Sequence, residues 1–138
     1  MLPAEEKDSS AQMNDWDYSR PWYHGSPIRL ATIRKESTIT QDYELARVFS
    51  HRPTVVSVSD DGRIEHDGTM PGFLYRIAED VQPGDVYPHL RSSMAWGKEW
   101  LTNRELQVAL IGPTQPLEEE RLTEEEIAEL RRRWKSRE

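Results

Sequence analysis

A histidine, a glycine and a serine stand together at the end of the first apolar segment of this chain. His24, Gly25 and Ser26 follow Trp22 and Tyr23, and this aromatic pair predicts a short strand that ends in a tight turn. An imidazole can accept or donate a hydrogen bond near neutral pH, and a glycine lets the backbone approach a ligand closely. This tripeptide is the first candidate for a binding site.

Two acidic residues in the second half of the chain are candidates for a partner carboxylate. Glu99 precedes Trp100 and a strand-like run, whereas Asp85 lies in a Pro-Gly-Asp turn. We favour Glu99 because the residues after it match a strand edge better than a turn does; the alternative is a solvated glutamate at a strand end. Glu105 can instead form a surface ion pair, and such pairs contribute only about 0–1 kcal/mol.

The sequence gives little support to disulfides, metal sites or a serine-hydrolase site. The sequence contains no cysteine, which excludes disulfides, thiolate zinc sites and cysteine nucleophiles. His51, His66 and His89 do not have the spacing of metal ligands, so we expect no metal. Ser26 lacks the Gly-x-Ser-x-Gly turn of serine hydrolases. The loop around His89 is a candidate for contacting a phosphate or an acceptor substrate, or is a plain exposed loop.

Composition indicates one small domain with tails, since 138 residues leave little room for a second core. The net charge of -7 argues against non-specific binding to a nucleic-acid backbone, although backbone N–H groups and one or two arginines are enough for a nucleotide phosphate. No apolar run approaches the roughly 20 residues that cross a bilayer. The N-terminus lacks a basic segment followed by an apolar one, so we expect a cytoplasmic protein.

The elements that must position these residues form an α+β pattern. A helix is expected to begin at Thr40 and to end before Pro53, with Leu45, Val48 and Phe49 on one face. A long irregular loop is expected over 79–97, and Gly112-Pro113 should close the core. Strands are expected over 22–26, 37–40, 54–59, 63–66, 73–77, 99–102 and 106–111, with a hairpin turn at 60–62 and 73–77 in the centre.

The ends of the chain have a different texture. Residues 1–19 predict a flexible acidic leader, 20–112 the folded domain, and 113–138 a linker with a C-terminal helix. Thr123 to Glu126 is a capping box, and the helix after it carries a thin apolar stripe. We expect this helix to pack back on the core; the alternative is a helix that binds a protein partner. The stripe consists of Ile127, Leu130 and Trp134.

The order of these motifs resembles the ADP-ribosyltransferase superfamily, in particular its poly(ADP-ribose) polymerase and rifampin ADP-ribosyltransferase group. The resemblance covers 22–112 and rests on Tyr23-His24-Gly25-Ser26, on Thr40 through Ala46 to Phe49, and on a late Glu-Trp strand head. It implies two small, mostly antiparallel β-sheets packed around an NAD-binding cleft. One main helix would follow the second strand, and the C-terminal helix would be appended.

The resemblance also implies roles for the candidate residues. His24 would hydrogen-bond the adenosine-side ribose of NAD⁺, and the backbone of Gly25 would pair with the nicotinamide amide. Ser26 would contact the same ribose or position the turn. A late carboxylate, Glu99 or Asp85, would hold the 2′-hydroxyl of the nicotinamide ribose and stabilise the oxocarbenium-like charge that develops as nicotinamide leaves.

The sequence departs from the family pattern at one aromatic position. Thr38 stands where the family carries a tyrosine that stacks on nicotinamide, and Ile39 stands where a phenylalanine follows. Thr38 and Thr40 then remain as polar residues of the cofactor site. Aromatic stacking has to come from elsewhere, and we favour Tyr43, which lies one turn into the helix. The other candidates are Tyr75, Trp96 and Trp100.

The expected function is therefore transfer of ADP-ribose from NAD⁺, with release of nicotinamide. The acceptor would be a protein side chain, a nucleic-acid end or a small molecule. An alternative is a non-catalytic nucleotide-binding or protein-interaction module on the same fold. A third possibility is an NAD⁺-dependent phosphotransferase that removes a 2′-phosphate from RNA, but the acidic balance of the chain counts against it.

Overall fold

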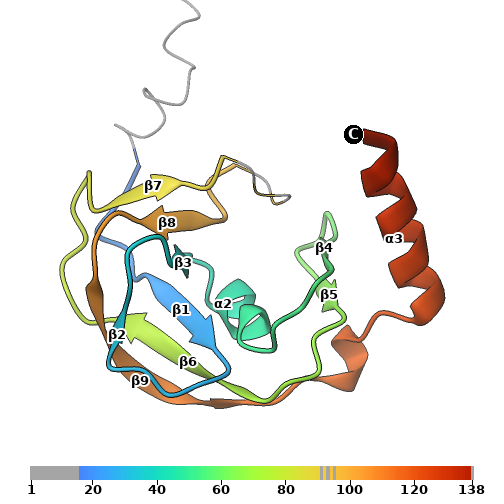
Figure 1. Cartoon of the computed structure of the whole chain (residues 1–138), viewed down its shortest axis with the longest axis horizontal. Helices are drawn as coiled ribbons and strands as arrows, with labels where there is room; N and C mark the ends of the chain where they lie inside the picture. Colours follow the sequence, from blue (N-terminus) through green and yellow to red (C-terminus); the bar gives the residue numbers. More distant parts are fainter. Residues whose placement is uncertain (1–15, 91, 93, 95, 138) are drawn as a thin grey trace, which may run out of the picture.

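The computed structural model describes residues 16–90, 92, 94 and 96–137, and the protein is an α+β domain with mostly antiparallel sheets, as the sequence predicts (Figure 1). Its elements in chain order are β1 (Tyr23–Ser26), β2 (Thr32–Ile33), β3 (Thr38–Ile39), α2 (Tyr43–Phe49), β4 (Val56–Val58), β5 (Ile64–His66), β6 (Gly72–Ile77), β7 (Val86–Pro88), β8 (Trp100–Thr102), β9 (Leu106–Thr114), the 3-10 turn η2 (Glu118–Glu120) and α3 (Glu124–Arg137).

The strands pair into three groups. One sheet has the order β1-β6-β9-β2, a second has the order β3-β8-β7, and β4 and β5 form a separate hairpin. A single bridge between Tyr23 and Thr40 joins the first two sheets. In Figure 1 these two sheets curve around a common interior, α2 lies between β1 and the β4–β5 hairpin, and α3 lies beyond that hairpin.

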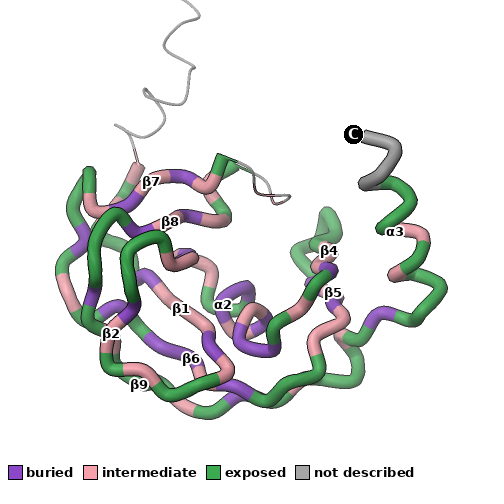
Figure 2. The backbone as a smooth tube through the Cα atoms, viewed as in Figure 1, coloured by how far each residue is buried: buried purple, intermediate pink, exposed green. Residues whose placement is uncertain are grey.

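The main core fills the space between the two larger sheets, where Figure 2 shows buried segments of β6 and β8. Trp100 is completely buried at its centre and contacts Trp22 edge-to-face at 5.3 Å between ring centroids. A smaller apolar cluster joins α2 to the hairpin and consists of Leu45, Val48 and Ile64. Burying a large apolar side chain of this kind stabilises the fold by roughly 1.5–3 kcal/mol.

The cap of helix α2 lies two residues later than the sequence predicts, at Asp42 instead of Thr40. The Asp42 carboxylate accepts hydrogen bonds from the backbone N–H groups of Glu44 and Leu45 at 3.1 and 3.2 Å. The Thr40 hydroxyl accepts from the N–H of Asp42 at 3.0 Å and so orders the turn before the helix. An aspartate cap satisfies N–H groups that have no partner within the helix.

The close contact of α2 with β1 requires a glycine at position 25. A Cβ atom placed there would lie 2.0 Å from the carbonyl oxygen of Ala46 and 2.7 Å from the nitrogen of Ser50. Both atoms belong to the backbone, Ala46 in the middle of α2 and Ser50 at its C-cap, so the clash cannot be relieved by a change of rotamer. The structure thus gives Gly25 a packing role in addition to the binding role that the sequence suggests.

Two short strands differ from the prediction. The segment 79–97 is not irregular throughout, because β7 pairs with β8 through Val86 and Thr102. The strand β2 was also not predicted, and it places α2 after the third strand instead of the second. Each of these two strands is too short to show an alternation of apolar and polar side chains.

The last core strand is longer than predicted and continues through Gly112 and Pro113 to Thr114. Leu106 and Gln107 of β9 pair with β2, and the N–H of Val108 donates to the carbonyl of Ala31 at 3.0 Å. Beyond Val108, no strand among the described residues pairs with this edge of β9. A proline is tolerated there because its missing N–H leaves no interstrand partner unsatisfied.

The two ends of the folded region contact the core unequally. Trp16 and Tyr18 pack against the main core, so the folded part reaches into the leader expected over 1–19, whose first 15 residues lie outside the described residues. The predicted capping box is formed: Thr123 and Glu126 exchange hydrogen bonds of 2.9 and 3.1 Å. In the described part, no helix is long and apolar enough to cross a bilayer.

Helix α3 lies beside the β4–β5 hairpin and away from the main core (Figure 1). Its Arg131 donates to the Thr54 hydroxyl at 3.1 Å and lies 3.9 Å from the carboxylate of Asp67. Ile127 and Leu130 are half-buried, and the side chain of Trp134 lies outside the described residues.

Candidate functional site

A pocket of about 370 Å³ lies where β1, β3, the end of α2 and the segment before β8 meet. Its lining includes His24, Gly25 and Ser26 of β1, Thr38 of β3, and Glu99. The volume falls in the lower part of the range of about 300–1,000 Å³ that is usual for small-molecule sites. We call this the His24 pocket; it brings together five of the residues that the sequence selects.

The His24 ring is held in one orientation and one tautomer. Its Nδ1–H donates to the carbonyl oxygen of Thr38 at 2.7 Å. In the neutral ring, Nε2 therefore keeps a lone pair and can accept a hydrogen bond from a hydroxyl group. Burial lowers the pKa of His24, while the hydrogen bond to Thr38 acts in the opposite direction. The site thus offers a neutral acceptor at physiological pH.

The strands β1 and β3 separate next to this histidine. Tyr23 and Thr40 exchange backbone hydrogen bonds of 2.7 and 3.0 Å, and the same antiparallel register would next pair Gly25 with Thr38. That pair is not formed, and the Thr38 carbonyl accepts a hydrogen bond from the His24 ring. Hydrogen-bonding directions alternate along a strand, so the N–H and C=O of Gly25 point away from β6 and into the opening. No described residue pairs with them.

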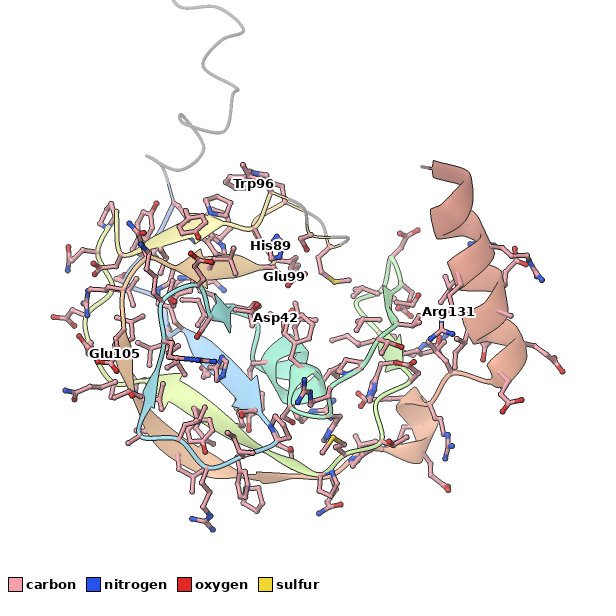
Figure 3. All side chains as sticks on the ribbon, viewed as in Figure 1. Asp42, His89, Trp96, Glu99, Glu105 and Arg131 are labelled. Atoms are coloured by element: carbon pink, nitrogen blue, oxygen red, sulfur yellow. The ribbon has the colours of Figure 1, made fainter. Side chains whose placement is uncertain are left out.

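The Glu99 carboxylate reaches the pocket from the residue just before β8. Its Oε1 accepts a short hydrogen bond from the hydroxyl of Ser92, and its backbone carbonyl accepts from the N–H of His89 at 3.0 Å. Figure 3 shows Glu99 and His89 at the same end of the β7–β8 pair, whereas Glu105 lies on the opposite side of the domain. Ser92 therefore orients the acid, a function that nothing in the loop sequence indicates.

Asp85 does not share this pocket. Its carboxylate lies 3.0 Å from the guanidinium of Arg104 and accepts from the N–H of Gln82 at 3.0 Å. The hydrogen bond from Arg104 lowers the pKa of Asp85. This ion pair is partly exposed, and Asp85 lies in a turn before β7. Of the two candidate acids, Glu99 is the one that lines the His24 pocket.

Thr40 and Tyr43 also lie apart from the His24 pocket and line a second pocket of about 330 Å³ together with Trp96. The reason is the alternation of side chains along β1. Tyr23 and His24 point to opposite faces of the strand, and the Tyr43 ring packs edge-to-face on Tyr23 at 5.4 Å. Tyr43 is consequently on the wrong face of β1 to stack on a ligand held by His24.

The aromatic side chain that does line the His24 pocket is Phe49, at the end of α2. Tyr75 and Trp100 are almost completely buried in the core and cannot reach a ligand. The sequence pattern assigns Phe49 to the apolar face of its helix, and the half-buried ring also packs against the smaller apolar cluster. Arg52 also lines the pocket, and its sequence context carries no signal of a site.

Ser26 has a structural role in this site. Its side chain is buried, and its hydroxyl accepts from the N–H of Ile28 at 3.2 Å. This bond holds the turn that follows β1, which is one of the two roles that the family resemblance implies. Thr38 contributes its backbone carbonyl to His24.

A second group of polar side chains lies beside α2, with two histidines buried and an ion pair partly buried. The rings of His51 and His66 stack at 5.6 Å, and Arg47 lies 2.5 Å from the carboxylate of Glu120. His66 Nδ1 accepts from the N–H of Gly68 at 3.0 Å, so in the neutral ring Nε2 carries the proton and cannot ligate a metal. Within the described ranges, no three histidine or acidic residues form a metal-binding group. This cluster ties α2 to β5 and η2.

Comparisons with protein-family models, with curated proteins and with solved structures gave no match. Function is therefore inferred from the geometry of the His24 pocket.

Proposed function

We propose that this protein transfers ADP-ribose from NAD⁺ to an acceptor and releases nicotinamide, with the dinucleotide in the His24 pocket. One observation carries the proposal. The imidazole of His24 in β1 and the carboxylate of Glu99 before β8, which are far apart in the sequence, line the same pocket beside the unpaired backbone of Gly25.

The nicotinamide end of NAD⁺ fits the opening between β1 and β3. Its carboxamide has one N–H donor group and one carbonyl acceptor, which match the free C=O and N–H of Gly25. The ring of Phe49 supplies an apolar aromatic wall for the pyridine ring. These contacts orient the glycosidic bond, and such orientation can lower the barrier substantially.

The two polar side chains then act on the sugars. Neutral His24 accepts a hydrogen bond from a ribose hydroxyl through Nε2, as its tautomer requires. The Glu99 carboxylate accepts from the 2′-hydroxyl of the nicotinamide ribose and stabilises positive charge that develops on the sugar ring. The bond between C1′ and the pyridine nitrogen breaks with its electron pair on nicotinamide. A lone pair of the acceptor forms the new bond to C1′, and the acceptor releases its proton.

The test is incubation of the purified chain with NAD⁺ and measurement of free nicotinamide by mass spectrometry. His24→Ala and Glu99→Gln should each lower the rate of release by about 100-fold or more, which is the usual effect of removing one group that stabilises a transition state. Glu105→Gln is the matched control, because Glu105 is exposed, its carboxylate accepts a hydrogen bond from the hydroxyl of Thr32, and it lies on the opposite side of the domain from Glu99 (Figure 3). Asp85→Asn should also keep the activity.

The outcomes separate the proposal from its alternative. Equal nicotinamide release by the wild-type chain and by both site variants would reject the site. Binding of NAD⁺ that His24→Ala weakens, without any release of nicotinamide by the wild-type chain, would instead indicate a non-catalytic nucleotide-binding module.

A further inference from the structure

Arg52 occupies a backbone conformation that favours glycine. Its φ is 55°, and its N–H donates to the carbonyl of Phe49 at 3.1 Å, just beyond the end of α2. Residues in this left-handed position after a helix are usually glycine, because a Cβ atom is crowded there. A glycine would adopt this backbone conformation at a lower energetic cost than an arginine does. We therefore expect a role for the Arg52 side chain.

The guanidinium of Arg52 has no hydrogen bond or ion pair with any described side chain, and the residue is exposed. It is also the one lysine or arginine among the described residues that line the His24 pocket. The carboxylate of Glu99 in the same pocket accepts a hydrogen bond from the hydroxyl of Ser92. The pocket therefore presents one acidic and one basic side chain, both at its wall.

We infer that Arg52 binds the diphosphate of the dinucleotide, an inference that rests on the proposed function. NAD⁺ carries a positive pyridinium ring and a negative diphosphate, and this charge order matches Glu99 beside the nicotinamide ribose and Arg52 at the diphosphate. A guanidinium donates two parallel hydrogen bonds to phosphate oxygens, which makes arginine better suited than lysine to this contact.

The backbone conformation allows loss of the guanidinium to be separated from loss of stability. Arg52→Gly removes the guanidinium and at the same time relieves the strain of the positive φ. The variant should melt at the same temperature as the wild-type chain or above it. Glu36→Gly is the matched control for the backbone, since Glu36 is the other described residue with a positive φ that is not glycine, at 69°, and it does not line the pocket. Arg52→Lys tests the need for the two-pronged contact.

Binding would be measured by isothermal titration with ADP-ribose, inorganic pyrophosphate and nicotinamide riboside, which contains no phosphate. We expect Arg52→Gly to weaken ADP-ribose and pyrophosphate binding at least tenfold and to leave nicotinamide riboside unchanged. Arg52→Lys should keep part of the affinity, and Glu36→Gly all of it.

The inference is overturned if Arg52→Gly binds ADP-ribose as the wild-type chain does, if it loses nicotinamide riboside to the same extent, or if the wild-type chain binds neither phosphate compound. The proposed transfer reaction fails separately. A wild-type chain that binds ADP-ribose through Arg52 but releases no nicotinamide from NAD⁺ would disprove the catalysis and support the diphosphate site.

Discussion

Replacing Gly25 by alanine should damage both the fold and the site, because β1 and α2 touch at this residue. The added Cβ would lie 2.0 Å from the carbonyl oxygen of Ala46, and α2 would have to move by at least about 1 Å to reach a tolerable distance of 3.0 Å. Overpacking a core usually costs about 1–3 kcal/mol. We expect the upper end of that range, about 3 kcal/mol, since the obstacle is helix backbone and not a flexible side chain.

Urea and thermal unfolding followed by tryptophan fluorescence would measure this effect. A loss of about 3 kcal/mol corresponds to a melting temperature lower by about 10 °C for a domain of this size. Gly112→Ala is the control, because nothing lies within 4 Å of a Cβ at that position. It should change the stability by less than about 0.5 kcal/mol.

The same substitution should lower nicotinamide release even where the variant is still folded, because Phe49 and Arg52 at the end of α2 move with the helix. A Gly25→Ala protein as stable as the Gly112→Ala control would refute the close packing of α2 on β1. A stable variant with normal activity would also refute the placement of the pocket at this contact.

Three further predictions concern pH and local hydrogen bonds. Burial lowers the pKa of His24, His51 and His66 below the ordinary value, so the unfolded chain binds protons more readily than the folded one. The free energy of unfolding, measured with urea, should therefore be constant above about pH 6.5 and fall below it, by at most about 1.4 kcal/mol per pH unit for each histidine; a flat profile from pH 8 to 5 would disprove this. Tyr75→Phe should cost about 1–3 kcal/mol in urea unfolding, because the buried hydroxyl accepts from the N–H of Leu30 at 2.7 Å; no measurable change would contradict it. Asp42→Ala should cost about 1 kcal/mol in the same assay and Asp42→Ser much less, and equal losses would argue against a capping role.

Features that depend on near neighbours in the chain could be predicted from the sequence. The capping box of Thr123 and Glu126 is formed by residues within one helical turn, and the hairpin turn before Arg63 has the positive φ of 87° that Gly62 permits. The largely apolar segment 73–77 predicted a central strand, and β6 lies between β1 and β9. For the capping box and the hairpin turn, a few consecutive residues contain most of the interactions that stabilise the element.

The candidate site was only partly predictable for the opposite reason. The sequence singled out His24 and ranked Glu99 before Asp85, but the convergence of His24 and Glu99 on one pocket depends on how β3 pairs with β8. Side-chain alternation along β1 then placed Tyr43 on the other face, and the end of α2 brought in Phe49.

The sequence by itself determined the residue types that can do chemistry and the helices and turns whose stabilising contacts are local. Only the tertiary structure determined which of those residues come together. Strand pairing joins segments that are far apart in the sequence, and the residues of a strand do not specify which other strand it pairs with. The separation of β1 from β3 beside Gly25 is the clearest case: the carbonyl of Thr38 accepts a hydrogen bond from the His24 ring there, and neither residue type indicates this contact.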